Sequence, residues 1–245
     1  MVVAGWRYTL AVTWVRRNEK PADVLERLWQ QVTASKIVCQ KALLDRYFFT
    51  VPVMQWLKKH GVPFIIPVVM RGPKPKRGKK PKGLRAYCGS KAGSYDYTHR
   101  AGSESVDFRL VINYKTGRNG KTNKREVKKM FFATWKVRLT PTQVRDAYRG
   151  RFGIETSYRQ LNQSRARTSS RDPLYRFLLV GLALFLRNLW QWLATDAGSP
   201  GARGGKNRGA AAKSTRPPRY RDVMDEFGEY LGRRTQPPIA TEPVS

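Results

Sequence analysis

Four side chains suited to phosphate and metal chemistry share one stretch of the sequence. They are Tyr148, Arg151, Glu155 and Asn162, separated by 3, 4 and 7 residues, a spacing that places them in one stripe of an α-helix. Carboxylates bind hard cations such as Mg²⁺, and arginine forms paired hydrogen bonds with phosphate oxygens. The stripe is therefore compatible with a metal held beside a phosphate. Glu155 also has a purely structural interpretation, because Arg151 and Arg159 lie four residues away on either side and could form helical salt bridges with it.

A second acid, Asp45, follows an apolar run over residues 37–44 that predicts a buried strand. Working residues of α/β sheets gather where strands end. Two carboxylates from different elements can place divalent ions for in-line attack on a phosphodiester. A turn-forming acid beside Arg46 is the structural alternative. The residues by themselves thus indicate a nucleotidyl-transfer or nuclease site and leave the structural interpretation open.

The elements that would carry Asp45 alternate in type. Strand, helix, strand, helix, strand within about 60 residues is typical of a mostly parallel α/β sheet. The predicted strands are residues 8–15, 37–44 and 62–69, and the predicted helices are residues 21–35 and 50–61.

A basic segment interrupts this pattern. Residues 71–85 carry eight Lys or Arg, three Pro, three Gly and no acid, which predicts a flexible loop. Residues 87–138 hold short stretches in which apolar and polar residues alternate, separated by a predicted turn at 117–120. This pattern predicts a small β-rich insertion. Three aromatic residues of this region could stack on unpaired bases, although packing within the insertion is the favoured interpretation. They are Tyr87, Tyr95 and Tyr97.

Helix resumes at Thr140, where Pro141 and Gln143 complete a capping box, and is predicted to run to about residue 164. A second helix from Pro173 is apolar nearly all round and is expected in the interior. The remainder is predicted to be a disordered basic tail with one short helix around residues 222–230. The chain is thus divided into a partial core (1–70), the basic loop and β-rich insertion (71–139), the core's C-terminal helices (140–197) and the tail (198–245).

The overall charge indicates a polyanionic partner. The 245 residues hold 48 Lys and Arg against 17 Asp and Glu, a formal net charge of +31, and 40% of them are hydrophobic. That apolar content excludes a wholly disordered chain, and phosphate would neutralise the self-repulsion. A charge run is often just a solvated segment, but the loop lies beside the proposed site. Its predicted DNA contacts are Lys74, Lys76, Arg77, Lys79 and Lys80.

Other features of the composition narrow the class further. Two Cys and two His cannot supply a zinc finger. The first residues lack the shape of a signal peptide, and the longest apolar run, residues 177–186, is too short to cross a bilayer. We therefore expect a cytoplasmic protein without a membrane partner.

Together these motifs resemble those of the DDE transposases, and more specifically of their insertion-sequence-four group. Residues 148–162 are similar to the group's signature Tyr-x2-Arg-x3-Glu-x6-Lys. Residues 43–49 and 61–67 resemble its second-aspartate region, and residues 7–12 resemble the strand before it. Arg187-Asn188-Leu189 matches a later apolar helix, so the resemblance extends from about residue 6 to residue 195.

The resemblance implies a ribonuclease H-like α/β core with a β-rich insertion before the Glu-bearing helix. It implies that Asp45 and Glu155 are the catalytic acids and bind two divalent ions, Mg²⁺ or Mn²⁺. A water molecule and then a DNA 3′-hydroxyl would attack phosphodiesters, so the implied function is DNA transposition with transposon ends and target DNA as partners. The residues expected to contact DNA are Tyr148, Arg151, Arg159 and Asn162.

Two departures from the family pattern change the expectation. Asn162 stands where the signature has Lys, which weakens one phosphate contact. The family's first aspartate belongs on a strand upstream of Tyr8, where this sequence has no acid, and Asp23 lies on a predicted helix. We therefore expect an N-terminally truncated core, from a shortened or split copy that is inactive alone. An upstream transposase fragment could supply the missing aspartate, and a homodimer is a further alternative.

Two other functions would also explain the charge. A non-catalytic DNA-binding remnant, or a regulator of transposition, would use the basic loop and tail for salt-sensitive binding. A basic ribosomal-type protein would explain the charge but not the stripe from Tyr148 to Glu155.

Overall fold

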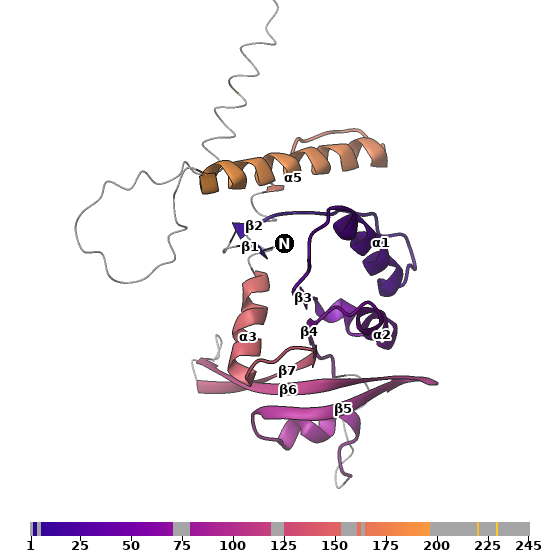
Figure 1. Cartoon of the computed structure of the whole chain (residues 1–245), viewed down its shortest axis with the longest axis vertical. Coiled ribbons are helices and arrows are strands. Elements are labelled where there is room, and N and C mark those ends of the chain that lie inside the picture. Colours follow the sequence, from indigo (N-terminus) through magenta and orange to yellow (C-terminus); the bar gives the residue numbers. More distant parts are fainter. Residues whose placement is uncertain are drawn as a thin grey trace, which may run out of the picture. The chain divides into compact units, whose positions relative to one another are not determined.

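The computed structural model describes residues 2–3, 6–70, 79–118, 125–152, 161–162, 165–196, 220 and 229 (Figure 1). The chain forms two compact units. The larger unit is Thr13–Phe152, and the smaller one joins Met1–Val12 with Gly153–Ser245. This division by compactness does not follow the four sequence segments, which stay a prediction.

The larger unit is built on a mixed sheet with strand order β3-β4-β7-β6-β5. β3 (Ala42–Leu43) and β4 (Phe64–Pro67) pair in parallel, as strands joined through a helix do. β7 (Arg125–Trp135), β6 (Glu104–Arg118) and β5 (Gly93–Ala101) continue the sheet with antiparallel pairing (Figure 1). The mixed sheet confirms the predicted α/β class, and the last three strands confirm the β-rich character of residues 87–138. The prediction of a mostly parallel sheet is wrong, because β3 and β4 are the one parallel pair among its described strands and the strands of residues 87–138 add antiparallel pairs.

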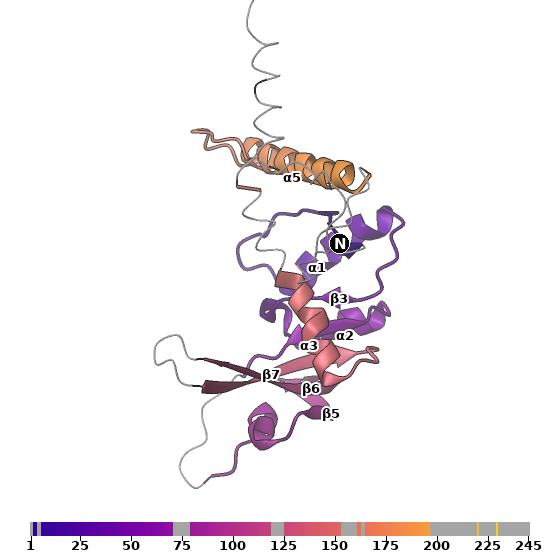
Figure 2. The ribbon, with the colours of Figure 1, turned by 90° about the vertical axis from the view of Figure 1, so that its left-hand side faces the viewer.

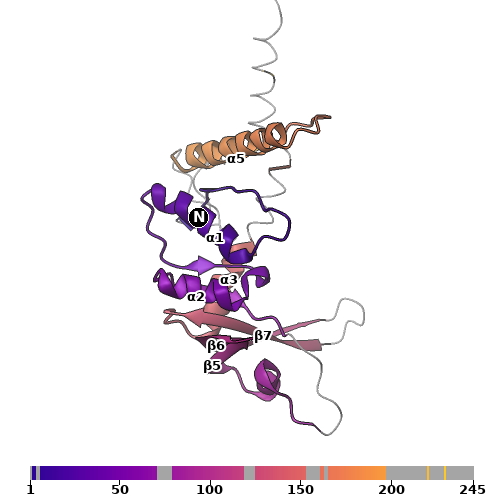
Figure 3. The same cartoon turned by 90° about the vertical axis from the view of Figure 1, so that its right-hand side faces the viewer.

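Helices cover both faces of this sheet, because successive strand residues point to opposite sides. On one face, α1 (Pro21–Ala34) and α2 (Val51–Lys59) lie next to each other (Figure 3), and Leu25 and Leu57 share an apolar cluster with Leu110. On the other face, α3 (Pro141–Arg149) packs against β6 and β7 (Figure 2), and Val144 lies against Val111 in a second cluster. The sheet therefore separates two apolar cores.

The predicted helices that begin near residues 21, 50, 140 and 173 are confirmed, because the signals in their first turns are local. The helix predicted around residues 222–230 lies outside the described residues, apart from residue 229. The capping box of α3 is present: Gln143 N donates to Thr140 Oγ1 at 3.3 Å, and Thr140 N donates to Gln143 Oε1 at 3.0 Å. Pro141 occupies the first helical position. A 3₁₀ turn, Gly150–Phe152, follows α3, and the rest of the predicted helix to residue 164 lies mostly outside the described residues.

Two predicted strands are wrong in extent. β3 covers only Ala42 and Leu43 of residues 37–44, and Val38 in that run is 88% exposed. Among the described residues β3 has β4 as its one neighbour, and an edge strand gains only half of the possible ladder bonds. Residues 8–15 also form no strand. Instead the Asn188 side chain accepts from Thr9 N at 2.9 Å and donates to Thr9 O at 2.6 Å.

The tyrosines of the insertion pack against one another. The ring of Tyr87 lies 5.4 Å from that of Tyr95 and 5.8 Å from that of Tyr97, both edge-on. Tyr97 also lies 5.5 Å from Phe108, and burial raises the pKa of its hydroxyl. Their place in the apolar cluster of α1 and α2 supports packing over base stacking.

The smaller unit contains a two-stranded ribbon, β1 (Val2–Val3) and β2 (Trp6–Arg7), and the helix α5 (Pro173–Asp196). One side of α5 is buried, and there Arg187 Nη1 donates to Arg7 O at 3.1 Å. The expectation that α5 lies in the interior is wrong for its other side, where Leu174 is 72% exposed. None of the described helices is long and apolar enough to span a membrane.

A clamp between α1 and the segment before it supplies a stability prediction. Arg27 donates to both carboxylate oxygens of Glu19, and it also donates to Thr13 Oγ1 at 3.1 Å and to Trp14 O at 2.7 Å. The Arg27 hydrogen bonds, and then the bond from the Arg16 backbone N–H, lower the pKa of Glu19 to about 2 from its ordinary value of 4.5.

We expect Glu19→Gln to destabilise the chain near neutral pH and to flatten its acid dependence. A depressed carboxyl pKa contributes stability above pH 4.5, and that stability is lost as the pH falls towards 2. Urea unfolding from pH 7 to pH 2 measures it. Glu26→Gln, which changes an exposed acid of α1, is the control. Equal pH profiles for Glu19→Gln and the unaltered chain would contradict the clamp.

Candidate active site at Asp45

Asp45 stands directly after β3 and begins a 3₁₀ turn, Arg46–Phe48. Its Oδ1 accepts the backbone N–H of Arg46 at an N···O distance of 2.6 Å, and its side chain is 53% exposed. Among the described residues no hydrogen bond reaches its Oδ2. One carboxylate oxygen therefore fixes the turn, and the other remains available to a ligand.

Arg151 is brought to Asp45 by the turn that follows α3. Its Nη2 lies 3.7 Å from Asp45 Oδ1, and its guanidinium carbon lies 5.4 Å from the centre of the Tyr148 ring. Tyr148 lies in the last turn of α3 and Arg151 in the 3₁₀ turn that follows, and a spacing of three residues places them on the same side. That side lies near β3, because Leu43 packs against the cluster that contains Tyr148. Asp45, Tyr148 and Arg151 therefore form one cluster, although 103 positions separate Asp45 from Tyr148 in the sequence.

Tyr148 joins this cluster to the core. Its side chain is buried, and its ring lies 5.3 Å from that of Phe132. Burial raises the pKa of its hydroxyl, the Asp45 charge raises it further, and the charges of Arg151 and Arg46 oppose the change. The phenol therefore stays protonated at neutral pH and can donate a hydrogen bond to an anion.

The structure places some of the other predicted residues and not all of them. Glu155 and Arg159 lie outside the described residues, as do Lys74, Lys76 and Arg77. Asn162 is exposed on a short helical turn of the smaller unit. Lys79 and Lys80 are exposed in a segment without regular structure.

The donor chemistry of Asp45 fits a hard divalent cation, because its open carboxylate oxygen is the kind of ligand such ions prefer. The part of the chain that the structure describes contains no group of three or more His, Cys, Asp or Glu that could hold a metal ion.

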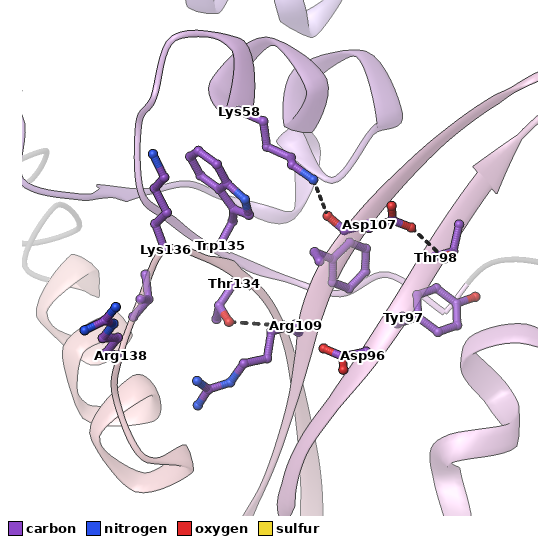
Figure 4. A pocket seen from close by; sticks show the side chains of 12 residues that line it. Lys58, Asp96, Tyr97, Thr98, Asp107, Arg109, Thr134, Trp135, Lys136 and Arg138 are labelled. Carbon is purple, nitrogen blue, oxygen red and sulfur yellow. Dashed lines mark hydrogen bonds between the residues drawn. The ribbon is translucent and has the colours of Figure 1, made fainter.

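The sequence reasoning missed a concave surface, which also belongs to the larger unit. We name it the Trp135 groove; it has a volume of about 740 Å³ (Figure 4). Its basic residues come from α2, from β6 and from the segment after β7. The run Trp135-Lys136-Val137-Arg138, which places two cations on alternate positions after a strand, is the signal that could have revealed it. The basic residues are Lys58, Arg109, Lys136 and Arg138.

Comparison with known proteins gives one family. Residues 9–189, which are most of the chain, match the family model described as the transposase DDE domain. The matched range contains Asp45, Tyr148, Arg151 and Glu155. No curated protein matches the chain. By its sequence match and by the mixed α/β sheet that carries the Asp45 cluster, the chain belongs to the transposase DDE domain family.

Proposed function

We propose that this chain acts in DNA transposition as a member of the insertion-sequence-four group, through phosphodiester hydrolysis and strand transfer. Family membership supports a transposase function with DNA as the substrate. The observation that carries the proposal is the cluster in which Arg151 lies 3.7 Å from Asp45 and packs on Tyr148. It combines an available carboxylate oxygen, a guanidinium and a neutral phenol in one place.

Asp45 and Glu155 are proposed as the acids that bind divalent metal. Transposase DDE domains generally use divalent metal ions. Two ions, Mg²⁺ or Mn²⁺, would supply activation of the attacking oxygen and stabilisation of the leaving one. Asp45 suits this role because the Arg46 N–H fixes its orientation through Oδ1 and leaves Oδ2 available.

Arg151 and Tyr148 are proposed to hold the DNA phosphate. A guanidinium offers several N–H donors to phosphate oxygens, and its weak ion pair with Asp45 keeps it at the site. The buried phenol adds one neutral donor whose position is fixed by Phe132. Arg159, Asn162 and the basic loop, from Lys74 to Lys80, are proposed as further DNA contacts.

We also propose that none of the acids before Asp45 is the family's first catalytic carboxylate. The acids that precede Asp45 in this sequence are Glu19, Asp23 and Glu26. Glu19 is held by Arg27, whereas Asp23 and Glu26 are exposed on α1. Because none of them follows a strand of the sheet, we propose that the first carboxylate comes from outside these 245 residues and that this polypeptide does not cleave DNA alone. On this view residues 71–139 are an insertion and residues 140–197 return to the core.

The partner that supplies the first carboxylate is proposed to cover α5. Six apolar residues of this helix alternate at spacings of three and four, as on a helix that packs against another element, and each is 40–64% exposed. A strip of this kind marks an interaction surface in a chain that is otherwise highly charged. The strip consists of Tyr175, Leu178, Leu182, Phe185, Leu189 and Trp192.

The test combines two polypeptides and one DNA. The full chain is purified with and without the polypeptide encoded immediately upstream, and each sample receives labelled duplex from the flanks of the gene with Mg²⁺ or Mn²⁺. We expect cleavage only when both polypeptides are present, together with a complex of the two in sedimentation. Robust cleavage by this chain alone would refute its inactivity. Sedimentation of this chain alone as a homodimer would replace the proposed partner of α5 by a second copy of the chain.

A non-catalytic DNA-binding remnant or regulator is the second candidate, and the surplus of positive charge supports it. The same experiment separates the two. Salt-sensitive DNA binding without cleavage in any combination of polypeptides would favour the regulator, whereas absence of DNA binding would overturn both candidates.

A further inference from the structure

Four basic residues line the Trp135 groove, and two of them lie over one indole. Lys136 Nζ lies 4.6 Å from the centre of the Trp135 ring, and Lys58 Nζ lies 5.9 Å from it. The ring of Phe64 is stacked on the same indole, with 6.4 Å between the two ring centres. Figure 4 shows Lys136 and Lys58 on either side of Trp135, with Arg109 and Arg138 below. The indole is therefore held in place and keeps the two ammonium groups near one another.

These cations are not neutralised within the described residues. Lys58 Nζ donates to the backbone oxygen of Asp107 at 2.9 Å, and Arg109 Nη2 donates to Leu139 O at 2.7 Å. Both acceptors are uncharged carbonyl groups. In the described part of the chain no carboxylate lies within ion-pair distance of any of the four cations, which include the exposed Lys136 and Arg138. The groove thus carries more positive than negative charge, because four basic residues line it against two acids, Asp96 and Asp107.

Lys136 also has an unfavourable backbone. Its φ is +50°. Residues other than Gly rarely adopt this left-handed conformation, because Cβ approaches the carbonyl oxygen. This strain turns the chain after β7 and places the ammonium over Trp135. Glycine would fit the turn better, so backbone preference does not explain the lysine at this position.

The groove lies apart from the Asp45 cluster. Phe64 opens β4 and pairs with Trp135, the last residue of β7, whereas Asp45 follows the other end of β3, which runs parallel to β4. The two sites are therefore at opposite ends of these strands. DNA contacts in the groove would not be part of the chemistry at Asp45.

We propose that the Trp135 groove binds the phosphodiester backbone of duplex DNA as a second contact, remote from the proposed catalytic acids. The inference rests on the proposed function, because it takes DNA as the ligand. Four cations that form no ion pair within the described residues, and that outnumber the two acids of the groove, are the electrostatic footprint of a phosphate contact. They contact phosphate without reading bases, so the site positions DNA and does not select a sequence.

Two acids make the charge unequal on the two sides of the groove. Asp96 and Asp107 line its side on β5 and β6, whereas Lys136 and Arg138 lie on the side towards α3 (Figure 4). Thr98 Oγ1 donates to Asp107 Oδ1 at 2.6 Å and so fixes that carboxylate. The negative charges repel a phosphate chain from β5, and the backbone of the DNA is therefore confined to the Lys136 and Arg138 side.

Lys136→Gly gives a clean test, because it removes the cation and relieves the backbone. In the full chain we measure affinity for a labelled duplex from 0.05 to 0.3 M salt, about the range over which phosphate contacts are resolved. Loss of one contact is expected to reduce the slope of log affinity against log salt by about 0.9 and to weaken binding about eightfold at 0.1 M salt. The thermal unfolding midpoint is expected to stay equal or rise.

Lys36→Gly is the matched control. Lys36 is exposed, has φ +54° and belongs to the same unit, but it does not line the groove. The control removes the same charge and relieves the same kind of strain, and it should leave the slope unchanged. Adding Arg138→Ala to Lys136→Gly should lower the slope by about 1.8 in total.

The outcomes separate the two proposals. Equal slopes for Lys136→Gly and Lys36→Gly, with DNA binding retained, would overturn the groove and leave the proposed function intact. Stronger effects on single-stranded than on duplex DNA would also overturn the duplex assignment. No DNA binding by the unaltered chain would instead overturn the proposed function. A loss of slope seen only for Lys136→Gly supports the groove whether or not the sample cleaves DNA.

Discussion

Asp45→Asn is expected to lower metal-dependent DNA cleavage by more than about 100-fold when the upstream polypeptide is present. Even the loss of a hydrogen-bond partner of a metal ligand costs about 10- to 100-fold, so the loss of the ligand itself should cost more. Asparagine can still accept the Arg46 N–H that Asp45 Oδ1 now accepts. The turn should therefore persist, and the loss should appear in the cleavage rate and not in the unfolding midpoint.

Asp23→Asn is the matched control, because it makes the same change of charge on an exposed acid of α1. It should cleave at the rate of the unaltered chain. Asp45→Cys adds a second readout: a thiolate accepts softer metals, so Mn²⁺ should restore some cleavage where Mg²⁺ restores none. Cleavage by Asp45→Asn at an unchanged rate would show that Asp45 is a turn acid and not a metal ligand.

Tyr148→Ala is expected to destabilise the larger unit by about 3–5 kcal/mol, as the truncation of buried aromatic residues does. Tyr148 is 6% exposed and packs on Phe132 in the cluster under α3. Its removal leaves a cavity beneath α3, which is followed directly by the turn that carries Arg151. Urea unfolding of the full chain, monitored by a signal from the larger unit, measures this change in stability.

Tyr148→Phe separates packing from hydrogen bonding. It keeps the ring and should change stability little at neutral pH, while the loss of the phenol donor should weaken cleavage. Because burial raises the pKa of the Tyr148 hydroxyl, the folded state favours its neutral form. That contribution is present below the pH at which an unfolded tyrosine ionises, about 10, and is lost as the pH rises through the folded value.

The alkaline loss of stability should therefore be smaller in Tyr148→Phe than in the unaltered chain. Tyr175→Phe, an exposed tyrosine of α5, should keep the alkaline profile unchanged. A Tyr148→Phe variant with the full cleavage rate would restrict Tyr148 to packing, and an unchanged alkaline profile would contradict the burial of its hydroxyl.

Local chemistry explains which elements were predicted well. The capping box at Thr140 and the prolines that open α1 and α2 act within one helical turn, so the sequence contains the whole signal. Strands depend on distant partners. Residues 37–44 have the composition of a buried strand, yet only Ala42 and Leu43 pair, because β4 is their one neighbour in the described chain.

The candidate site divides along the same line. Helical periodicity alone predicted that Tyr148 and Arg151 share one side of α3, and the turn after the strand indicated Asp45. Neither pattern could bring the two together, because that contact depends on how α3 packs across the sheet. The Trp135 groove was missed for the same reason, since Lys58, Arg109 and Lys136 come from three elements that meet only in the folded sheet.

The sequence by itself determined the charge, the helices and the residue types that can hold metal and phosphate, because each depends on composition or on spacing within one element. The tertiary structure decided which of them meet. Packing on the two faces of one sheet joins Arg151 to Asp45 at one end of the strands and gathers four cations in the Trp135 groove at the other. The physical reason is that side chains distant in sequence become neighbours only through the burial of the apolar surfaces between them.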